Sequence, residues 1–257
     1  MLDVVNREGF IIGKIDRTGE EKINNFGSKM RIINYRGAND IDVYFEEYNW
    51  IAKNKGYKEF KLGRTSCPYE ARFYGIGYIG EGKYNSNSNK NIFSRWHNML
   101  KRCYDSEYQE KHPSYKGCEV CDEWLNFQNF AKWFEENYYE VNNEKMELDK
   151  DIIIKGNKLY SSITCVFVPQ RINKLFTKRQ NDRGDYPIGV SPYKDKFIAR
   201  CNNTSSKLGY YNTPEEAFQT YKTYKENLIK EIAEEYKNEI PEVLYKSLYK
   251  YEVEITD

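Results

Sequence analysis

The chain has 257 residues, 39% hydrophobic and 16% aromatic, and a formal net charge of +1. Its 24 tyrosines and 13 phenylalanines exclude a disordered or fibrous protein, because such chains lack the aromatic side chains that fill a core. No apolar run approaches the ~20 residues that span a bilayer, and the first ten residues lack the pattern of a signal peptide. We therefore expect a cytoplasmic protein without membrane contact, whose six cysteines are reduced thiols or metal ligands.

Residues 1–75 predict a small antiparallel β module, for which a barrel is one arrangement. Short runs of alternating or β-branched apolar residues are separated there by glycine, asparagine and aspartate. The runs are GFIIGKI, MRIINYRG, IDVYFEE and YKEFKLG. The next segment, GIGYIGEGKYNSNSNKN, is rich in glycine, but no apolar helix start follows it. It predicts a hairpin and a linker rather than a phosphate-binding loop.

Two amphipathic helices follow within residues 76–180. The segments IFSRWHNMLKRCY and WLNFQNFAKWFEENYY place bulky apolar residues at helical spacing, which is typical of a core face. Residues 184–238 predict three strands and a helix. That helix begins at Thr213, because Glu216 three residues later completes a capping box and Pro214 occupies the first position. Residues 239–257 predict a helical tail, and the fold class is α+β.

Two segments carry a family resemblance. W..ML.RCY, YKGCEVCDEWLNFQNFAKW, LDKD and GNKLYSS.TC.FVPQRIN, between Trp96 and Phe176, resemble the H-N-H (HNH) endonucleases of bacteriophages and mobile introns. IGV, KFIAR and LGYYNTPEEAFQTY, between Gly184 and Tyr236, resemble the ethylene-response-factor (APETALA-type) DNA-binding domain. The resemblance implies a phage-encoded protein in the cytoplasm of a bacterial host, a ββα nuclease core, and double-stranded DNA as partner.

The resemblance implies a catalytic site on a hairpin and a following helix, which holds Mg²⁺ or another divalent cation. Asp149 occupies the acidic position and Asn173 begins the closing helix, whereas Lys150 and Thr164 replace the usual histidine and asparagine. An ordinary lysine is protonated at neutral pH, so we expect Lys150 to bind a phosphate rather than to activate water. Asp151, two residues along the strand from Asp149, shares its face and is the second candidate cation ligand.

Other residues are candidates for zinc or DNA. A structural zinc site is one interpretation of the four cysteines in this region, since two of them form a C-x2-C pair, and buried free thiols are the other. These four are Cys103, Cys118, Cys121 and Cys165. Position by position, the resemblance to the DNA-binding domain implies DNA contacts from Ser191, Tyr193, Lys194, Lys196, Arg200, Asn202 and Lys207. His97 and His112 lack metal-ligand spacing, and we expect ordinary surface or capping roles for them.

Two hypotheses about function remain open. The first is a metal-dependent DNA endonuclease. The second is an inactive HNH fold that binds, either as a DNA-binding regulator or as a phage-encoded inhibitor of a host defence system such as an anti-CRISPR. Residues 171–207 carry nine basic against three acidic residues, which suits DNA, whereas residues 119–151 carry ten acidic against three basic residues, which suits a cation or a basic host protein.

Overall fold

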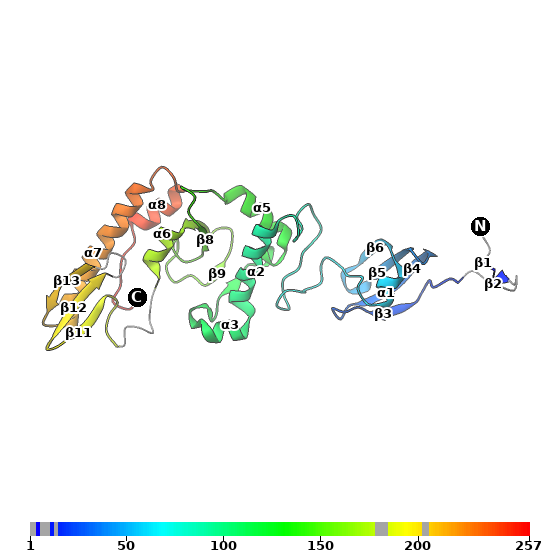
Figure 1. The fold of residues 1–257 in the computed structure, drawn as a ribbon, viewed down its shortest axis with the longest axis horizontal. Helices are drawn as coiled ribbons and strands as arrows, with labels where there is room; N and C mark the ends of the chain where they lie inside the picture. Colours follow the sequence, from blue (N-terminus) through cyan, green and yellow to red (C-terminus); the bar gives the residue numbers. More distant parts are fainter. Residues whose placement is uncertain (1–3, 6–10, 13–14, 178–184, 202–205) are drawn as a thin grey trace. The chain divides into compact units, whose positions relative to one another are not determined.

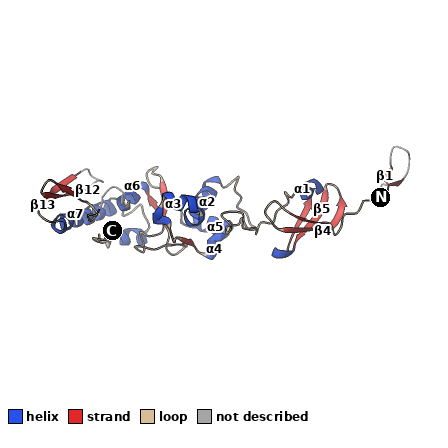
Figure 2. Ribbon diagram, turned by 90° about the horizontal axis from the view of Figure 1, so that it is seen from below, coloured by secondary structure: helices blue, strands red, loops and turns tan. Residues whose placement is uncertain are grey.

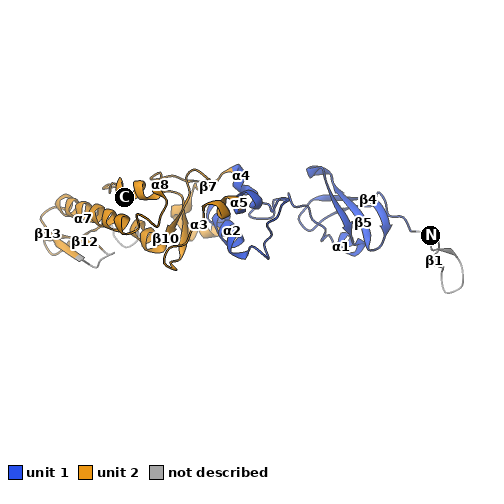
Figure 3. Ribbon diagram, turned by 90° about the horizontal axis from the view of Figure 1, so that it is seen from above, with its two compact units in different colours: residues 1–106, 122–131 blue, residues 107–121, 132–257 orange. Residues whose placement is uncertain are grey.

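The structure is a computed structural model that describes residues 4–5, 11–12, 15–177, 185–201 and 206–257. Helices and strands are separate along much of the chain, and the fold is α+β, as predicted (Figure 1). Its contacts divide the chain into two compact units (Figure 3). Unit 1 comprises residues 1–106 and 122–131, and unit 2 comprises residues 107–121 and 132–257. The chain therefore passes from one unit to the other three times. These places differ from the module boundaries predicted from the sequence, and those boundaries stay predictions.

Unit 1 contains a four-stranded antiparallel sheet in the order β3-β4-β5-β6. Successive side chains of a strand point to opposite faces, so alternate residues of β4 and β5 form the inner face of the sheet. The fully buried residues of this face are Met30, Ile32, Ile41, Val43 and Phe45. The strands are β3 (Glu21–Ile23), β4 (Lys29–Gly37), β5 (Asp40–Phe45) and β6 (Trp50–Lys55), with a 3-10 turn η1 (Glu46–Tyr48) between the last two. Ahead of them β1 (Val4–Val5) pairs with β2 (Ile11–Ile12). The predicted antiparallel β module is confirmed.

One predicted strand of this module is wrong. The run YKEFKLG forms helix α1 (Tyr57–Lys61), whose Phe60 is fully buried against the sheet. Tyr57 and Phe60 stand three residues apart, which places both on one side of a helical turn. Strand β6 was not predicted, because Ala52 is its one buried residue and the strand shows little apolar alternation.

The two predicted amphipathic helices are confirmed. The first is α2 (Lys90–Tyr104), and the second divides into α4 (Asp122–Leu125) and α5 (Phe127–Asn137). Trp96 of α2 donates its indole N–H to the carbonyl of Trp124, 2.6 Å away. The glycine-rich segment packs against the start of α5, where the Gln128 amide donates to the carbonyls of Ile79 and Tyr84. Helix α2 begins at Lys90, within the end of that segment, and the interpretation as a hairpin and linker stays a prediction.

The hairpin-and-helix motif lies in unit 2. Strands β8 (Met146–Asp149) and β10 (Val166–Pro169) pair antiparallel, and α6 (Gln170–Asn173) with the 3-10 turn η3 (Lys174–Phe176) follows at once. Between the strands, β9 (Leu159–Tyr160) pairs in parallel with β7 (Glu119–Val120). Two short helical turns, α3 (Ser106–Lys111) and η2 (Pro113–Tyr115), precede β7.

The predicted three strands and helix are also present in unit 2 (Figure 2). Strands β11 (Val190–Tyr193), β12 (Lys196–Cys201) and β13 (Ser206–Tyr211) form an antiparallel sheet in that order. Helix α7 (Pro214–Glu235) covers one face, and Thr213 and Glu216 form the predicted capping box at its start. Helix α8 (Glu242–Tyr249) matches the predicted helical tail.

Candidate nucleic-acid interface and acidic site

The sheet β11–β13 has one face packed on α7 and an opposite, outer face. Ala199 and Cys201 of β12 are buried with Ala217 and Phe218 of α7, so the alternate residues of the strand point outward. Pairing aligns Ser191, Ile198 and Tyr210 across the three strands on the outer face. Ile198 in the middle of this face is fully buried, whereas Tyr210 beside it is 48% exposed, so the part of the face that a partner can reach lies around Ile198.

Two tyrosines and several cations occupy the outer face. Tyr193 and Tyr210 are 42% and 48% exposed, and their ring centres lie 5.1 Å apart. Arg200 of β12 pairs in register with Lys207 of β13, and Tyr193 pairs with Lys196. All three of these cationic residues are exposed, as is Lys194 at the β11–β12 turn. The predicted DNA-contacting residues thus gather on one surface, except that Asn202 lies outside the described residues.

Tyr210 was not among the predicted DNA-contacting residues. The sequence KLGYY gives two adjacent tyrosines, and only one of them can point outward from a strand. The pairing register shifts between Ala199 and Arg200, which alters the alternation along the sheet. Tyr211 packs toward the helix-covered core and Tyr210 points away from it, a choice that the sequence pattern alone does not make.

Asp149 ends β8 at the start of a tight turn. Its Oδ1 accepts hydrogen bonds from the backbone N–H groups of Asp151 and Ile152, at 2.9 and 2.8 Å. Burial, and then the nearby charge of Asp151, raise the pKa of Asp149 to about 6, against the lowering effect of the two N–H groups. Within the described residues Oδ2 accepts no hydrogen bond. Asp149 therefore has one oxygen held in place and one available to a ligand.

Asp151 and Lys150 are placed differently from the prediction. Strand β8 ends at Asp149, so Asp151 lies in the following turn and does not share a strand face with it. Lys150 is only 7% exposed. Its Nζ donates to the carbonyl of Asn157 at 3.0 Å and lies 3.3 Å from Asp151 Oδ2. In this arrangement the Lys150 ammonium holds the loop after β8 in place, and the expected phosphate contact stays a prediction.

Thr164 also holds the loop. Its buried hydroxyl donates to the carbonyl of Leu159 at 2.7 Å and lies 2.9 Å from the Ser161 hydroxyl. Asn173 ends α6, and within the described part of the chain its side-chain amide has no hydrogen-bond partner. Among the four predicted catalytic positions, Asp149 and Asn173 therefore keep polar atoms for a ligand, whereas Lys150 and Thr164 are engaged in the fold.

Three of the four candidate zinc cysteines lie in unit 2. Cys118 and Cys121 flank β7, and the N–H of Cys121 donates to the carbonyl of Tyr160 in β9. Cys121 is close enough to Cys165 to affect its ionisation, and burial raises the pKa of Cys165 to about 12. Cys103 belongs to unit 1. Over the described ranges, no three residues among histidine, cysteine, aspartate and glutamate are grouped so as to hold a metal ion. The zinc site stays a prediction.

Neither histidine has the surroundings of a general base. His97 packs among the rings of Phe73, Tyr74 and Phe93, and burial lowers its pKa. His112 is exposed and contacts Tyr108, with ring centres 4.3 Å apart and ring planes tilted by 35°. Both make aromatic contacts, and the prediction of non-catalytic roles stays open.

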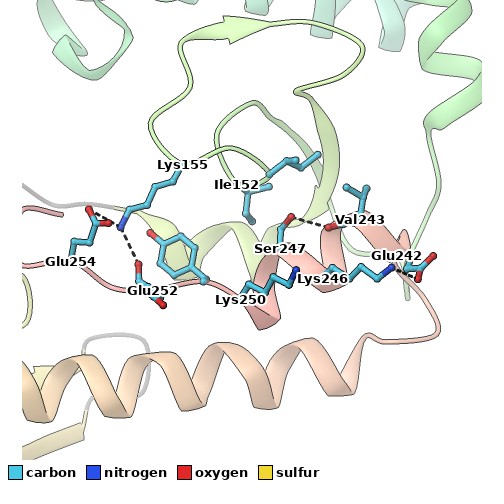
Figure 4. A pocket seen from close by; sticks show the side chains of 11 residues that line it. Ile152, Lys155, Glu242, Val243, Lys246, Ser247, Lys250, Glu252 and Glu254 are labelled. Carbon is cyan, nitrogen blue, oxygen red and sulfur yellow. Dashed lines mark hydrogen bonds and ion pairs between the residues drawn. The ribbon is translucent and has the colours of Figure 1, made fainter.

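An open cavity of about 620 Å³ lies between α8 and the loop after Asp149 (Figure 4). Its rim carries three lysines and three glutamates: Lys155, Lys246, Lys250, Glu242, Glu252 and Glu254. Lys246 is paired with Glu242 and Lys155 with Glu254, so the charges largely compensate one another. This cavity lacks the excess positive charge that a polyanion needs.

Comparisons with known proteins found no relatives of this chain. No protein-family model matches the chain, and neither a curated protein nor a solved structure matches it. Among the helices in the described residues, none is long and apolar enough to cross a membrane.

Proposed function

We propose that this protein binds double-stranded DNA through the outer face of the sheet β11–β13. The observation that carries the proposal is the gathering of two exposed tyrosines and of Lys196, Arg200 and Lys207 on that face. β-strands can enter the major groove of B-form DNA, in which arginine reads guanine and aromatic side chains contact thymine methyl groups. The lysines contact phosphates and position the sheet without reading bases.

The charge distribution supports DNA over other partners of this face. The chain as a whole has a net charge of only +1, so attraction to a polyanion depends on a local excess of cations. Within the described part of the sheet the exposed charged residues are four cations and Asp195, at the β11–β12 turn. The sheet face is therefore the part of unit 2 best suited to a phosphate backbone.

The test is DNA binding by the full chain and by matched variants. Affinity for a mixed-sequence duplex is measured by fluorescence anisotropy at low salt. Arg200→Ala is expected to weaken binding about ten-fold, since a bidentate base contact contributes about 1–3 kcal/mol. Lys116→Ala, an exposed lysine of the same unit away from the sheet, is the control and is expected to change nothing. Equal effects of the two substitutions would contradict the proposal.

The second candidate function is metal-dependent DNA hydrolysis at Asp149. The observation that favours it is the hairpin-helix arrangement, in which Asp149 Oδ2 and the Asn173 amide have no hydrogen-bond partner among the described residues. Mg²⁺ needs few protein ligands, because it keeps several waters and binds substrate phosphates. Asp149 would hold it, with Asn173 as a further oxygen donor, and the ion would stabilise the leaving oxygen of a phosphodiester. Lys150 has no part in activating water, because its ammonium is bound to Asn157 and Asp151.

Hydrolysis is tested by nicking of supercoiled plasmid with Mg²⁺, Mn²⁺ or EDTA. Asp149→Asn is the decisive variant, because the amide oxygen can still accept the two backbone N–H groups while the negative charge is lost. Glu147→Gln, on the same strand, is the control. Nicking that needs metal, is lost in Asp149→Asn and persists in Glu147→Gln supports an enzyme. DNA binding without any nicking supports the inactive binder instead.

A further inference from the structure

The sheet face and the Asp149 hairpin are joined by one continuous helix. The first half of α7 buries Ala217, Phe218 and Tyr221 against the sheet β11–β13. The second half buries Ile229, Ile232, Ala233 and Tyr236, the residue after the helix, in another core. That second core contains Val166 and Val168 of β10, Ile172 of α6, Leu175 of η3, and Leu244 and Leu248 of α8. Helix α7 therefore contributes residues both to the core under the sheet β11–β13 and to the core of the Asp149 hairpin.

A second connection runs beside the helix, through residues 251–257. Lys155, from the loop after Asp149, donates to the carbonyl of Glu252 at 3.0 Å and to Asp257 Oδ2 at 2.8 Å. One residue on, Lys222 of α7 donates to the carbonyl of Val253 at 2.9 Å. The N–H of Val253 in turn donates to Glu226 of α7 at 2.8 Å. The loop that begins at Asp149 is thus tied to the helix that supports the sheet.

The apolar core strengthens this connection. Tyr251 packs edge-on against Phe176 of η3, with ring centres 4.8 Å apart. Val253 is buried in the core under the sheet, while Tyr251 packs against both cores. The partly buried Tyr251 and the buried Val253, two residues apart, therefore join the core of the hairpin to the core of the sheet.

From these contacts we infer that α7 holds the Asp149 hairpin at a fixed offset from the DNA-reading sheet, so that both act on DNA as one body. The inference rests on the proposed DNA binding and adds a spacing rule to it. Phe218 and Ala233, the packing points of the two halves, are 15 residues apart, which is about 22 Å along a helix. Projected onto a DNA axis, an offset of this length covers at most about seven base pairs, at ~3.4 Å per base pair, which sets the upper limit for the distance between the hairpin and the sequence under the sheet.

The physical coupling is tested without DNA, by hydrogen exchange of the full chain. Ile172→Val removes one methylene group from the hairpin core, a change small enough to leave the protein folded. It is expected to speed the exchange of the slowest amides in β12 about five-fold, because the two cores open together. Ile32→Val, in the sheet of unit 1, is the matched control and leaves β12 unchanged. Faster exchange in β10 and α6 with none in β12 would overturn the inference.

The spacing is tested with a cleavage reagent on the hairpin loop. Ile154, 51% exposed, is replaced by cysteine and labelled with an iron chelate, and the full chain is bound to a duplex selected for tight binding. Cuts confined to one side of the protected sequence, within about seven base pairs of it, are expected. Cuts scattered on both sides would overturn the fixed offset. If no duplex binds at all, the proposed function fails, while the hydrogen-exchange result still decides the coupling.

Discussion

Lys150 is the residue whose role changes most between sequence and structure. In the HNH resemblance it stands at the position of a histidine that takes a proton from water. Its ammonium instead donates to the Asn157 carbonyl and pairs with Asp151, and its side chain is only 8% exposed. The side chain therefore stabilises the loop between β8 and β9. A buried cation with a charged and a neutral oxygen partner is costly to remove, because the partners lose a charge-assisted bond.

Replacement of Lys150 should destabilise the protein. Lys150→Ala is expected to lower the free energy of unfolding by about 2 kcal/mol, the usual contribution of a hydrogen bond to a charged group. Urea denaturation measures it. The control is Lys145→Ala, at an exposed lysine just before the same strand whose ammonium forms an ion pair with Glu147. That change is expected to stay within about 0.5 kcal/mol. A stable Lys150→Ala protein would show that the lysine is kept for another reason.

Lys225 is a second buried lysine, in the middle of α7, and it makes stability depend on pH. It is 4% exposed, and burial lowers its pKa from 10.5 to about 8. Between these two values the unfolded chain binds a proton that the folded protein does not, so stability rises as the pH rises from 8 to 10.5. Below pH 8 the folded protein carries the cost of the buried charge.

Lys225→Met should remove this dependence. The substitution keeps the length of the side chain without its charge. It is expected to raise the free energy of unfolding at pH 7 by on the order of 2 kcal/mol, and to flatten the rise in stability between pH 8 and 10.5. Urea denaturation at several pH values measures both effects, with the exposed Lys237→Met as control. Unchanged pH dependence in Lys225→Met would show that other groups titrate in this window.

At the scale of elements, the contact between the sheet and α7 depends on a glycine. Gly189, just before β11, has a φ of +78°, and a Cβ added there would overlap the ring of Tyr221 in α7. Gly156, in the loop after β8, has nearly the same φ of +77°, but an added Cβ would have nothing within 4 Å. Alanine at Gly156 would therefore introduce backbone strain alone, whereas alanine at Gly189 would introduce the same strain and a steric overlap with Tyr221.

Replacing each of these two glycines by alanine should lower the free energy of unfolding by different amounts. Gly156→Ala is expected to cost about 1 kcal/mol, the strain of an L-residue in the left-handed region. Gly189→Ala adds the collision with Tyr221, and a total loss of about 3 kcal/mol is expected, since overpacking a core costs about 1–3 kcal/mol. Thermal denaturation of both proteins measures the difference. Equal losses would mean that α7 shifts to make room at little cost.

At the scale of the whole molecule, charge is balanced overall and segregated locally. The net charge of +1 excludes general attraction to DNA, so the salt dependence of binding reports only on the cations that touch phosphate. Three exposed lysines at the sheet are the candidates, because Arg200 is assigned to a base: Lys194, Lys196 and Lys207.

The affinity for DNA should therefore fall steeply as the salt concentration rises. If the three lysines neutralise phosphates, affinity falls about forty-fold between 50 and 200 mM salt. The double variant Lys196→Ala with Lys207→Ala is expected to reduce the slope of log affinity against log salt by about two. Anisotropy titrations at four or more salt concentrations measure it, with Lys116→Ala again as control. A slope unchanged in the double variant would place the phosphate contacts elsewhere.

Much of the secondary structure was predictable because local signals agreed with one another. The capping box at Thr213, the aromatic faces of α2 and α5, and the alternation in β4 and β5 all concern neighbours in sequence, and each is confirmed. The run YKEFKLG misled because a short apolar segment suits strand or helix equally, and burial of Phe60 decided for the helix.

The sequence by itself determined the fold class and a sheet whose outward positions are rich in cations and tyrosine, while the hairpin followed by a helix was implied by the family resemblance. Tertiary structure decided which polar groups remain available, since hydrogen bonds from residues several positions away engage Lys150 and Thr164 but leave Asp149 Oδ2 without a partner in the described residues. It also decided that α7 belongs to two cores at once. Periodicity shows that a helix has an apolar face, but not which elements cover each half, because that depends on contacts between residues far apart in sequence.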